Sequence, residues 1–370
     1  MKKRILIFYI SKFSGHFHAA RAIEKGLMSV MESVKIEKIN AFSYTNPILE
    51  KIINKAYTEV IKKKPEIWGN MYDNPEVMKK TQKARSALHH FNLAKIKKLL
   101  ELHNPDVVFC TQAFPCGMVA DYKRLCGKNI PLIGILTDHA PHSYWLFDEV
   151  NYYVVPFSET ADILKKKGVS PDKIKVYGIP IDLKFSVLQE KLQIKKALGF
   201  RDDKNVVLLM GGSQGLGAME TVANVLLNHK KRDYQLIVVT GSNRKLYNRL
   251  KRMKIIERDK DVFVLPYVDN INDLMDAADI IITKAGGMTV AETLAKRLPM
   301  LIVDPIPGHE RMNTDFLTAK GAAIEVKDYG NIAVIIEKLF NSKETLKQMS
   351  SSMAELAKPN SAMDIAKLAL

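Results

Sequence analysis

The sequence is poor in cysteine and contains no long apolar segment. Three cysteines occur in 370 residues, Cys110, Cys116 and Cys126, and none of them belongs to a Cys-x-x-Cys pair. This small odd number excludes a disulfide-stabilised scaffold and indicates a reducing compartment, with the thiols in or near the core. Because no run of about 18 consecutive apolar residues is present, no transmembrane helix is predicted.

Signatures of metal-dependent enzymes are also missing. The nine histidines show no ligand spacing with cysteine or acidic residues, so neither a metal nor a resident cofactor is expected. The single Asp-x-Asp sequence, Asp259-Lys260-Asp261, lies in a charged loop before a predicted strand, and we interpret it as a solvated turn.

Charge of one sign is abundant instead. The net charge is +16, and residues 51–100 hold half of it, with twelve basic and four acidic residues. Such an excess favours a polyanionic partner or an anionic surface. Helix-turn-helix, zinc-finger and RNP-like signatures are absent from the sequence, so a nucleic-acid partner is not expected.

Short β-branched runs alternate with helical stretches, which predicts an α/β protein built from βα units around parallel sheets. A Pro/Gly break at 178–182 separates two series of such units, so we expect two doubly wound domains, 1–180 and 181–345. A helical stretch at 346–370 is expected to pack back on the first domain. The predicted strands are 5–10, 34–39, 107–110, 132–137 and 152–155, then 206–210, 236–240, 262–265, 280–283 and 300–303.

A glycine-rich turn follows the first strand of the second series. It reads Gly211-Gly212-Ser213-Gln214-Gly215 and precedes a helix from about residue 218. Glycines allow close approach of the backbone to a phosphate, and a helix N-terminus offers unpaired N–H groups. On this turn alone, phosphate binding and tight strand–helix packing are equally good interpretations.

A second strand, glycine turn and helix occur further along. Gly286 and Gly287 would expose a helix N-terminus to a diphosphate, with Met288 and Thr289 in its first turn. Glu292 lies about one helical turn beyond Thr289, where a carboxylate can accept ribose hydroxyls. A solvated helix acid is the alternative for Glu292, but its position after a Gly-Gly turn favours a nucleotide contact.

A third loop, 304–308, contains two prolines and a glycine and ends at a predicted helix start. His309, Glu310 and Asn313 would face one way there, an arrangement that suits hydrogen bonds to sugar hydroxyls.

The order of four motifs resembles the inverting GT-B glycosyltransferases of family 28. This family contains the peptidoglycan N-acetylglucosamine transferase and the monogalactosyl- and glucosyl-diacylglycerol synthases. The resemblance implies two Rossmann-like domains with an interdomain cleft: an N-terminal acceptor domain that docks on the membrane and a C-terminal UDP-sugar domain. It covers essentially the whole chain, and its motifs are 211–217, 265–268, 283–292 and 305–313.

The resemblance also implies roles for the donor residues of the second domain. The backbone near Val268 would hold uracil, Glu292 would bind ribose, and His309 with Glu310 would contact the donor sugar. Many glycolipid synthases carry glutamine where this chain has His309, so the identity of the sugar, glucose or galactose, stays open. The remaining donor-binding residues would be Gly211, Gly212, Ser213, Gln214, Gly215, Gly286, Gly287, Met288, Thr289 and Asn313.

In the first domain, Gly15 and His16 match a Gly-His motif of the glycolipid synthases. His16 would act as the base that takes the proton of an acceptor hydroxyl. Without the resemblance, a helix-capping histidine would be the preferred interpretation. Gly15 and three residues near the same cleft, Asp138, His142 and Trp145, would orient the acceptor or the base.

Aromatic residues lie among the lysines of 51–100, as in segments that dock on anionic bilayers. Lys62, Lys63, Lys64 and Trp68 are the expected membrane contacts, with a solvated lysine face as the alternative. The resemblance favours the membrane and places the protein in the cytoplasm, peripherally on the inner face of the cell membrane.

The resulting hypothesis is metal-independent transfer of glucose or galactose from a UDP-sugar to diacylglycerol, with inversion. One alternative is transfer of N-acetylglucosamine from its UDP form to a lipid-linked cell-wall precursor. A UDP-sugar sensor without catalytic activity is the second alternative.

Overall fold

The computed structural model forms two compact units, each with a parallel sheet of its own. The first unit comprises Met1–Leu183, Pro307–His309 and Asn360–Leu370, and the second Lys184–Ile306 and Glu310–Pro359. The chain therefore passes from the first unit to the second after Leu183, where the sequence predicted 180. The described residues are 2–12, 14–47, 91–139, 141–253, 256 and 259–370.

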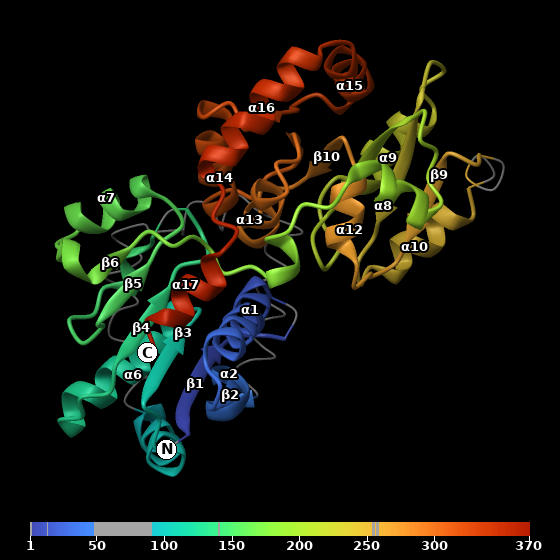
Figure 1. The fold of residues 1–370 in the computed structure, drawn as a ribbon. Helices are drawn as coiled ribbons and strands as arrows, with labels where there is room; N and C mark the ends of the chain where they lie inside the picture. The colour runs from blue at the N-terminus through green and yellow to red at the C-terminus, as the bar shows by residue number, and fades with distance from the viewer. Residues whose placement is uncertain (1, 13, 48–90, 140, 254–255, 257–258) are drawn as a thin grey trace. The chain divides into compact units, whose positions relative to one another are not determined.

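The sheet of the first unit has six strands in the order β2-β1-β3-β4-β5-β6 (Figure 1). Because the strand order reverses between β1 and β3, their carboxyl ends form the switch point at which doubly wound sheets bind ligands. The strands are β1 (Lys3–Tyr9), β2 (Val34–Asn40), β3 (Val107–Cys110), β4 (Leu132–Ile135), β5 (Tyr152–Val154) and β6 (Ile174–Lys175).

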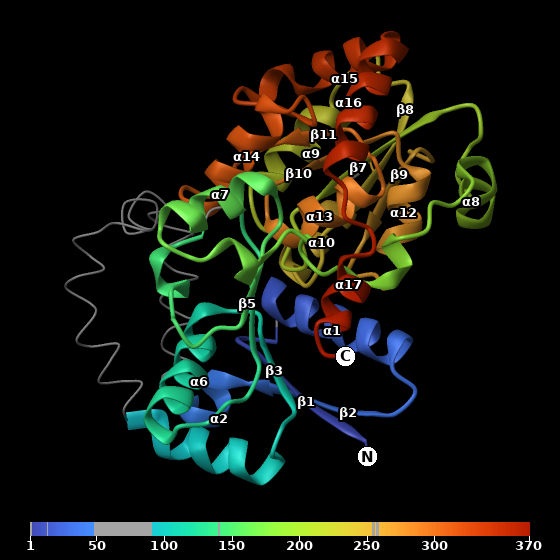
Figure 2. The ribbon, with the colours of Figure 1, turned by 60° about the vertical axis from the view of Figure 1, so that its left-hand side comes forward.

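Alternate residues of β1 face opposite layers of helices. Ile5 and Ile7 belong to a core with residues of α1 and α17, whereas Leu6 and Phe8 pack with residues of α6. Figure 2 shows α1 and α17 beside one another and α6 across the sheet from them. The helical parts are α1 (Gly15–Val30), α2 (Ala41–Thr45), residues 91–103, α6 (Ala113–Cys126), η1 (Ser143–Trp145), α7 (Ser158–Lys166), η2 (Pro171–Lys173) and α17 (Ser361–Lys367).

The C-terminal stretch forms two helices, where the sequence predicted one. Helix α16 (Lys343–Leu356) belongs to the second unit, and only α17 lies on the first. Pro359 lies between the two helices and prevents one continuous helix, because proline cannot continue a helix. Helices α1 and α17 cross so closely at Gly26 that a Cβ there would overlap the carbonyl oxygen of Ala362.

The second sheet is also parallel, in the order β12-β11-β10-β7-β8-β9, so its switch point lies between β7 and β10. Its strands are β7 (Asn205–Met210), β8 (Tyr234–Val239), β9 (Val262–Leu265), β10 (Ile280–Thr283), β11 (Met300–Ile302) and β12 (Ala323–Glu325). Its helices are η3 (Leu183–Phe185), α8 (Lys191–Leu198), α9 (Met219–Leu227), α10 (Arg244–Lys251), α12 (Ile271–Ala277), α13 (Gly287–Ala295), α14 (His309–Ala319), η4 (Tyr329–Asn331), α15 (Ile332–Asn341) and α16.

All ten predicted strands are confirmed, and the α/β class with two parallel sheets is as predicted. Within the described residues, no helix combines the length and the apolar character that a membrane crossing requires.

Candidate functional site

His16 lies at the carboxyl end of β1, at the switch point of the first sheet. The chain leaves the strand through Ser11, which has a left-handed φ of 51°. The hydroxyl of Ser14 is within hydrogen-bond distance of the carbonyl oxygens of Ile10 (2.5 Å) and Ser11 (2.7 Å), and it fixes the turn. Helix α1 then begins at Gly15, so His16 is its second residue.

The ring of His16 contacts residues that follow two other strands. Its Nδ1 is 2.7 Å from the carbonyl oxygen of Thr111, after β3, and 3.3 Å from the hydroxyl of Thr137, after β4. Burial lowers the pKa of His16, although the Asp138 charge and the Thr111 hydrogen bond act in the opposite direction. The imidazole is therefore neutral near pH 7, as a general base must be.

The other predicted acceptor residues occupy different environments. Asp138 follows β4 and is half-buried, and it acts on His16 through its charge. Trp145 is 5% exposed and packs against Gly134 of β4. It would therefore affect an acceptor only indirectly, by holding neighbouring residues in place. The ring of His142 stacks on Trp145 with centroids 6.3 Å apart. The predicted membrane contacts Lys62, Lys63, Lys64 and Trp68 lie outside the described residues.

In the second unit, the glycines of the first turn have different surroundings. A Cβ at Gly211 would overlap the carbonyl oxygen of Leu216, and one at Gly215 would overlap that of Thr240. Packing of the chain on itself therefore explains these two glycines without a ligand. Gly212 differs, because its added Cβ would meet only Lys284, at 3.9 Å. Gly212 also has a left-handed φ of 68°, which by itself favours glycine, so phosphate binding at this turn stays a prediction.

Lys284 connects the two glycine turns at the switch point of the second sheet. It follows β10, and a Cβ added at Gly286 would lie 3.5 Å from its Nζ. Its side chain also approaches Gly212 of the other turn. The two turns that were predicted to hold a diphosphate therefore approach one ammonium group. Lys284 lies within the motif at 283–292, but no role was predicted for it.

Helix α13 begins directly after this lysine. Gly286 is its N-cap residue, and no side chain of the described residues caps it, so the N–H groups of its first turn remain available to an anion. Met288 is half-buried and Thr289 is 9% exposed in that turn. Glu292 is half-buried and follows at the helical spacing that the ribose prediction requires.

Glu310 is engaged with the protein on both carboxylate oxygens. Its side chain is 1% exposed; Oε1 accepts from the Lys284 ammonium, and Oε2 accepts from the backbone N–H of Ile306 at 3.0 Å. Asn313, also buried, donates to the carbonyl oxygen of Ala285 at 2.8 Å. Both residues of α14 therefore hold the Lys284 turn, and their predicted contacts with donor sugar stay predictions.

Asp304 completes the charged group at this edge of the sheet. It follows β11 with a left-handed φ of 48°, which non-glycine residues adopt rarely. Partial burial raises the pKa of Asp304, as does the Glu310 carboxylate, while Lys284 acts against both. His309 is the first residue of α14 and is half-buried, and it belongs to the first unit, although the sequence predicted it within the second domain.

The remaining donor residues lie in the loops after β7 and β9. Ser213 is half-buried and Gln214 exposed in the first of these loops, and Val268 is half-buried in the second. The carboxyl ends of parallel strands lie at one edge of a sheet, so these loops share that edge with Lys284.

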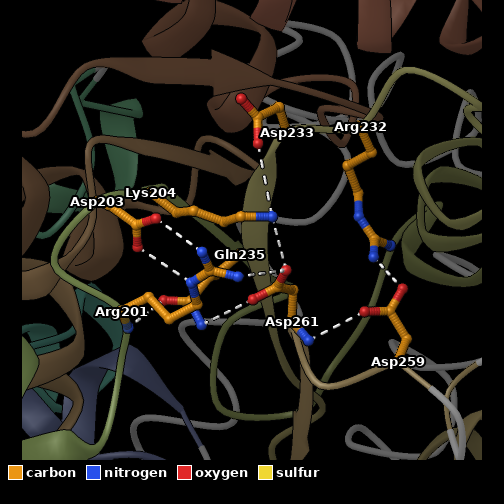
Figure 3. A network of polar contacts seen from close by, with 8 residues as sticks. All are labelled: Arg201, Asp203, Lys204, Arg232, Asp233, Gln235, Asp259 and Asp261. Atoms are coloured by element: carbon orange, nitrogen blue, oxygen red, sulfur yellow. Dashed lines mark hydrogen bonds and ion pairs between the residues drawn. The ribbon is translucent and has the colours of Figure 1, made fainter.

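The Asp-x-Asp sequence is not a simple solvated turn. Asp261 accepts from Lys204 at 2.7 Å and from Gln235 at 3.2 Å, and Asp259 pairs with Arg232 (Figure 3). Its carboxylates therefore neutralise cations of the protein. Among the described residues, no group of three histidine, cysteine, aspartate or glutamate side chains could hold a metal ion.

Comparison with known families accounts for both halves of the chain. Residues 16–181 match the monogalactosyldiacylglycerol (MGDG) synthase family, and residues 206–368 match the glycosyltransferase family 28 C-terminal domain. The chain belongs to glycosyltransferase family 28. The match to the first half starts at His16, and the match to the second includes Lys284 and Glu310.

Individual relatives of this family 28 glycosyltransferase extend the similarity over nearly its full length. It is 29% identical over 366 residues to a protein from Bacillus pumilus named processive diacylglycerol beta-glucosyltransferase, with 98% of this chain and 93% of the relative covered. Its identity to the Bacillus subtilis protein of that name is 28%, with 97% and 92% covered. The crystal structure of MurG from Acinetobacter baumannii shares the fold, with a TM-score of 0.67, 15% identity and 99% of each chain covered.

Proposed function

We propose that this family 28 glycosyltransferase transfers a hexose from a UDP-sugar to diacylglycerol, and that the hexose is glucose. The Lys284 ammonium held beside Gly212 and Gly286 carries the proposal, because two turns and a cation suit a diphosphate. Relatives that span 97 to 98% of the chain are named for transfer of glucose to diacylglycerol. Galactose is the alternative donor sugar.

The reaction requires a base and a stabilised leaving group. Nε2 of His16 takes the proton of the free diacylglycerol hydroxyl as its oxygen attacks the anomeric carbon. The bond from that carbon to the UDP oxygen breaks, and UDP leaves with the electron pair. The Lys284 ammonium and the first turn of α13 stabilise the negative charge that develops on UDP. Attack from the face opposite UDP gives a β-linked product from an α-linked donor.

Charge also supports a membrane location. The net charge of +16 favours an anionic bilayer, and the acceptor is a lipid. We infer that the enzyme works peripherally on the inner face of the cell membrane, in the cytoplasm. Lys62, Lys63, Lys64 and Trp68 would supply the contacts, each lysine with about 1 kcal/mol near an anionic surface.

The reaction is proposed to need no metal, since protein groups supply the charge that a cation would otherwise provide. Treatment of the enzyme with EDTA should therefore leave turnover unchanged. Loss of turnover that added Mg²⁺ or Mn²⁺ restores would contradict this part of the proposal.

The decisive experiment measures product on liposomes that contain diacylglycerol and an anionic lipid. UDP-glucose, UDP-galactose and UDP-N-acetylglucosamine are supplied in parallel. A glycolipid formed from UDP-glucose supports the proposal, and product from UDP-galactose alone would correct the sugar. Product from UDP-N-acetylglucosamine alone, or UDP binding without transfer from any donor, would overturn it.

A His16→Ala variant tests the base, with His18→Ala on the same helix as the matched control. We expect H16A to lose about 10²- to 10⁴-fold in turnover and to keep its affinity for UDP. H18A should retain turnover. Full activity in H16A would refute the assignment of the base.

A further inference from the structure

We propose that Thr111 and Thr137 are positioning residues that hold the base His16 in its Nδ1–H tautomer, in place of a carboxylate partner. The inference deepens the proposed function and rests on it for its catalytic consequence. Its structural part, the tautomer, stands on the first unit alone and can be measured without any substrate.

The tautomer follows from the identity of the partner atom. Nδ1 of His16 lies 2.7 Å from the carbonyl oxygen of Thr111, and a carbonyl oxygen can only accept a hydrogen bond. Nδ1 must therefore carry the proton. In the neutral ring, Nε2 then holds the lone pair, which is what a base needs. The described residues provide no hydrogen-bond partner for Nε2, so its lone pair is available.

Thr111 holds the backbone of His16 as well as the ring. Its hydroxyl is 3.0 Å from the carbonyl oxygen of His16 and 3.2 Å from that of Phe8, and its own N–H donates to Phe8 at 3.0 Å. Thr111 is fully buried. One residue therefore fixes the end of β1, the first turn of α1 and the imidazole together.

Thr137 provides a second contact at the same ring nitrogen. Its hydroxyl oxygen is 3.3 Å from Nδ1 and the residue is 6% exposed. Because Nδ1 carries a proton, this oxygen acts as a second, weaker acceptor. The chain thus brings the ends of three neighbouring strands, β1, β3 and β4, to one imidazole.

The nearby carboxylate does not have this role. Asp138, next to Thr137, affects His16 only through its charge, and no hydrogen bond joins the two among the described residues. Neutral acceptors orient the ring without stabilising the imidazolium as strongly as a carboxylate in contact would. They therefore allow burial to keep the resting base unprotonated.

The test begins with the tautomer in the full-length protein labelled with ¹⁵N-histidine. Two-bond ¹H–¹⁵N correlation spectra above pH 7 distinguish the protonated from the unprotonated ring nitrogen, and H16Q assigns the signals. We expect Nδ1 protonated and Nε2 unprotonated. An Nε2–H tautomer in the wild type would overturn the proposal.

Variants then connect the tautomer to turnover. Thr111→Val removes the hydroxyl, and we expect turnover on diacylglycerol liposomes to fall about 10²-fold, as for a misplaced catalytic group, with UDP affinity unchanged. Thr111→Ser keeps the hydroxyl and should restore most of the loss. Thr137→Val removes the weaker acceptor but leaves the Thr111 carbonyl, so the Nδ1–H tautomer should persist while turnover falls less than in T111V. Thr160→Val is the control, since Thr160 is equally buried and bonds another histidine carbonyl, that of His139.

The tautomer should stay unchanged in both T111V and T137V, because both keep the Thr111 carbonyl, and normal turnover in both would overturn the positioning role. Should T111V fail to fold, T137V and T111S still decide it, because the first must lower turnover and the second must not. If the wild type forms no glycolipid yet shows the Nδ1–H tautomer, the proposed function fails and the structural part of this inference stands.

Discussion

Replacing Glu310 by glutamine distinguishes direct recognition of the donor sugar from support of Lys284. The carboxylate accepts one charged hydrogen bond from Lys284 and one from the N–H of Ile306. Hydrogen bonds to charged groups contribute about 1.5 to 3 kcal/mol each, and glutamine keeps one acceptor oxygen, so we expect E310Q to lose about 2 to 4 kcal/mol of unfolding free energy. A displaced Lys284 should also weaken UDP binding about tenfold, which corresponds to about 1.4 kcal/mol.

Calorimetric titration with UDP, which lacks the sugar, separates the two roles. Support of Lys284 predicts weaker binding of UDP itself, whereas sugar recognition predicts a loss only with UDP-glucose. Glu325→Gln is the matched control. Glu325 pairs with Arg311, which lies on the same helix as Glu310, and the E325Q variant should change UDP affinity little. Unchanged UDP affinity in E310Q, with a loss confined to UDP-glucose, would refute the reasoning.

Three further predictions concern stability. Gly26→Val should cost about 1 to 3 kcal/mol in chemical denaturation, since its side chain would force α1 and α17 apart; an unchanged midpoint would contradict that packing. Lys296→Met leaves Asp276 buried without its partner, and thermal unfolding should show a loss of about 3 to 5 kcal/mol. Hydrogen bonds from Arg311 lower the pKa of Glu325, so this pair stabilises fully above about pH 4.3 and progressively less as the pH falls through the lowered pKa. Lowering the pH should therefore destabilise the wild type more than E325Q, as monitored by circular dichroism during an acid titration.

The central strands could be predicted from sequence because burial on both faces makes them continuous apolar runs. Ile280–Thr283 and Val107–Cys110 agree to the residue. Strands β6 and β12 were missed, since an edge strand of two or three residues carries too short a pattern to recognise. The single helix expected at 346–370 was wrong because amphipathic periodicity continues on both sides of Pro359.

The candidate site was predictable where glycines and helix starts coincide, as at Gly286 and Gly287. No role could be predicted for Lys284 within its motif, because its contact with Glu310 spans 26 residues. The contact between Thr111 and His16 could not be predicted for a similar reason, since the two residues are 95 positions apart in the sequence. Only the strand order brings such residues together.

The attachment of α17 to the first unit has a consequence for synthesis on the ribosome. Ile365, Ala366 and Ala369 belong to the same core as Ile5 and Ile7, so this core stays open until residues 360–370 have been translated. The second unit, residues 184–306 and 310–359, does not depend on this C-terminal segment. It can therefore fold before the first unit is complete. The nascent chain thus carries an exposed apolar surface on α1 for almost its entire synthesis, a surface that chaperones would have to shield.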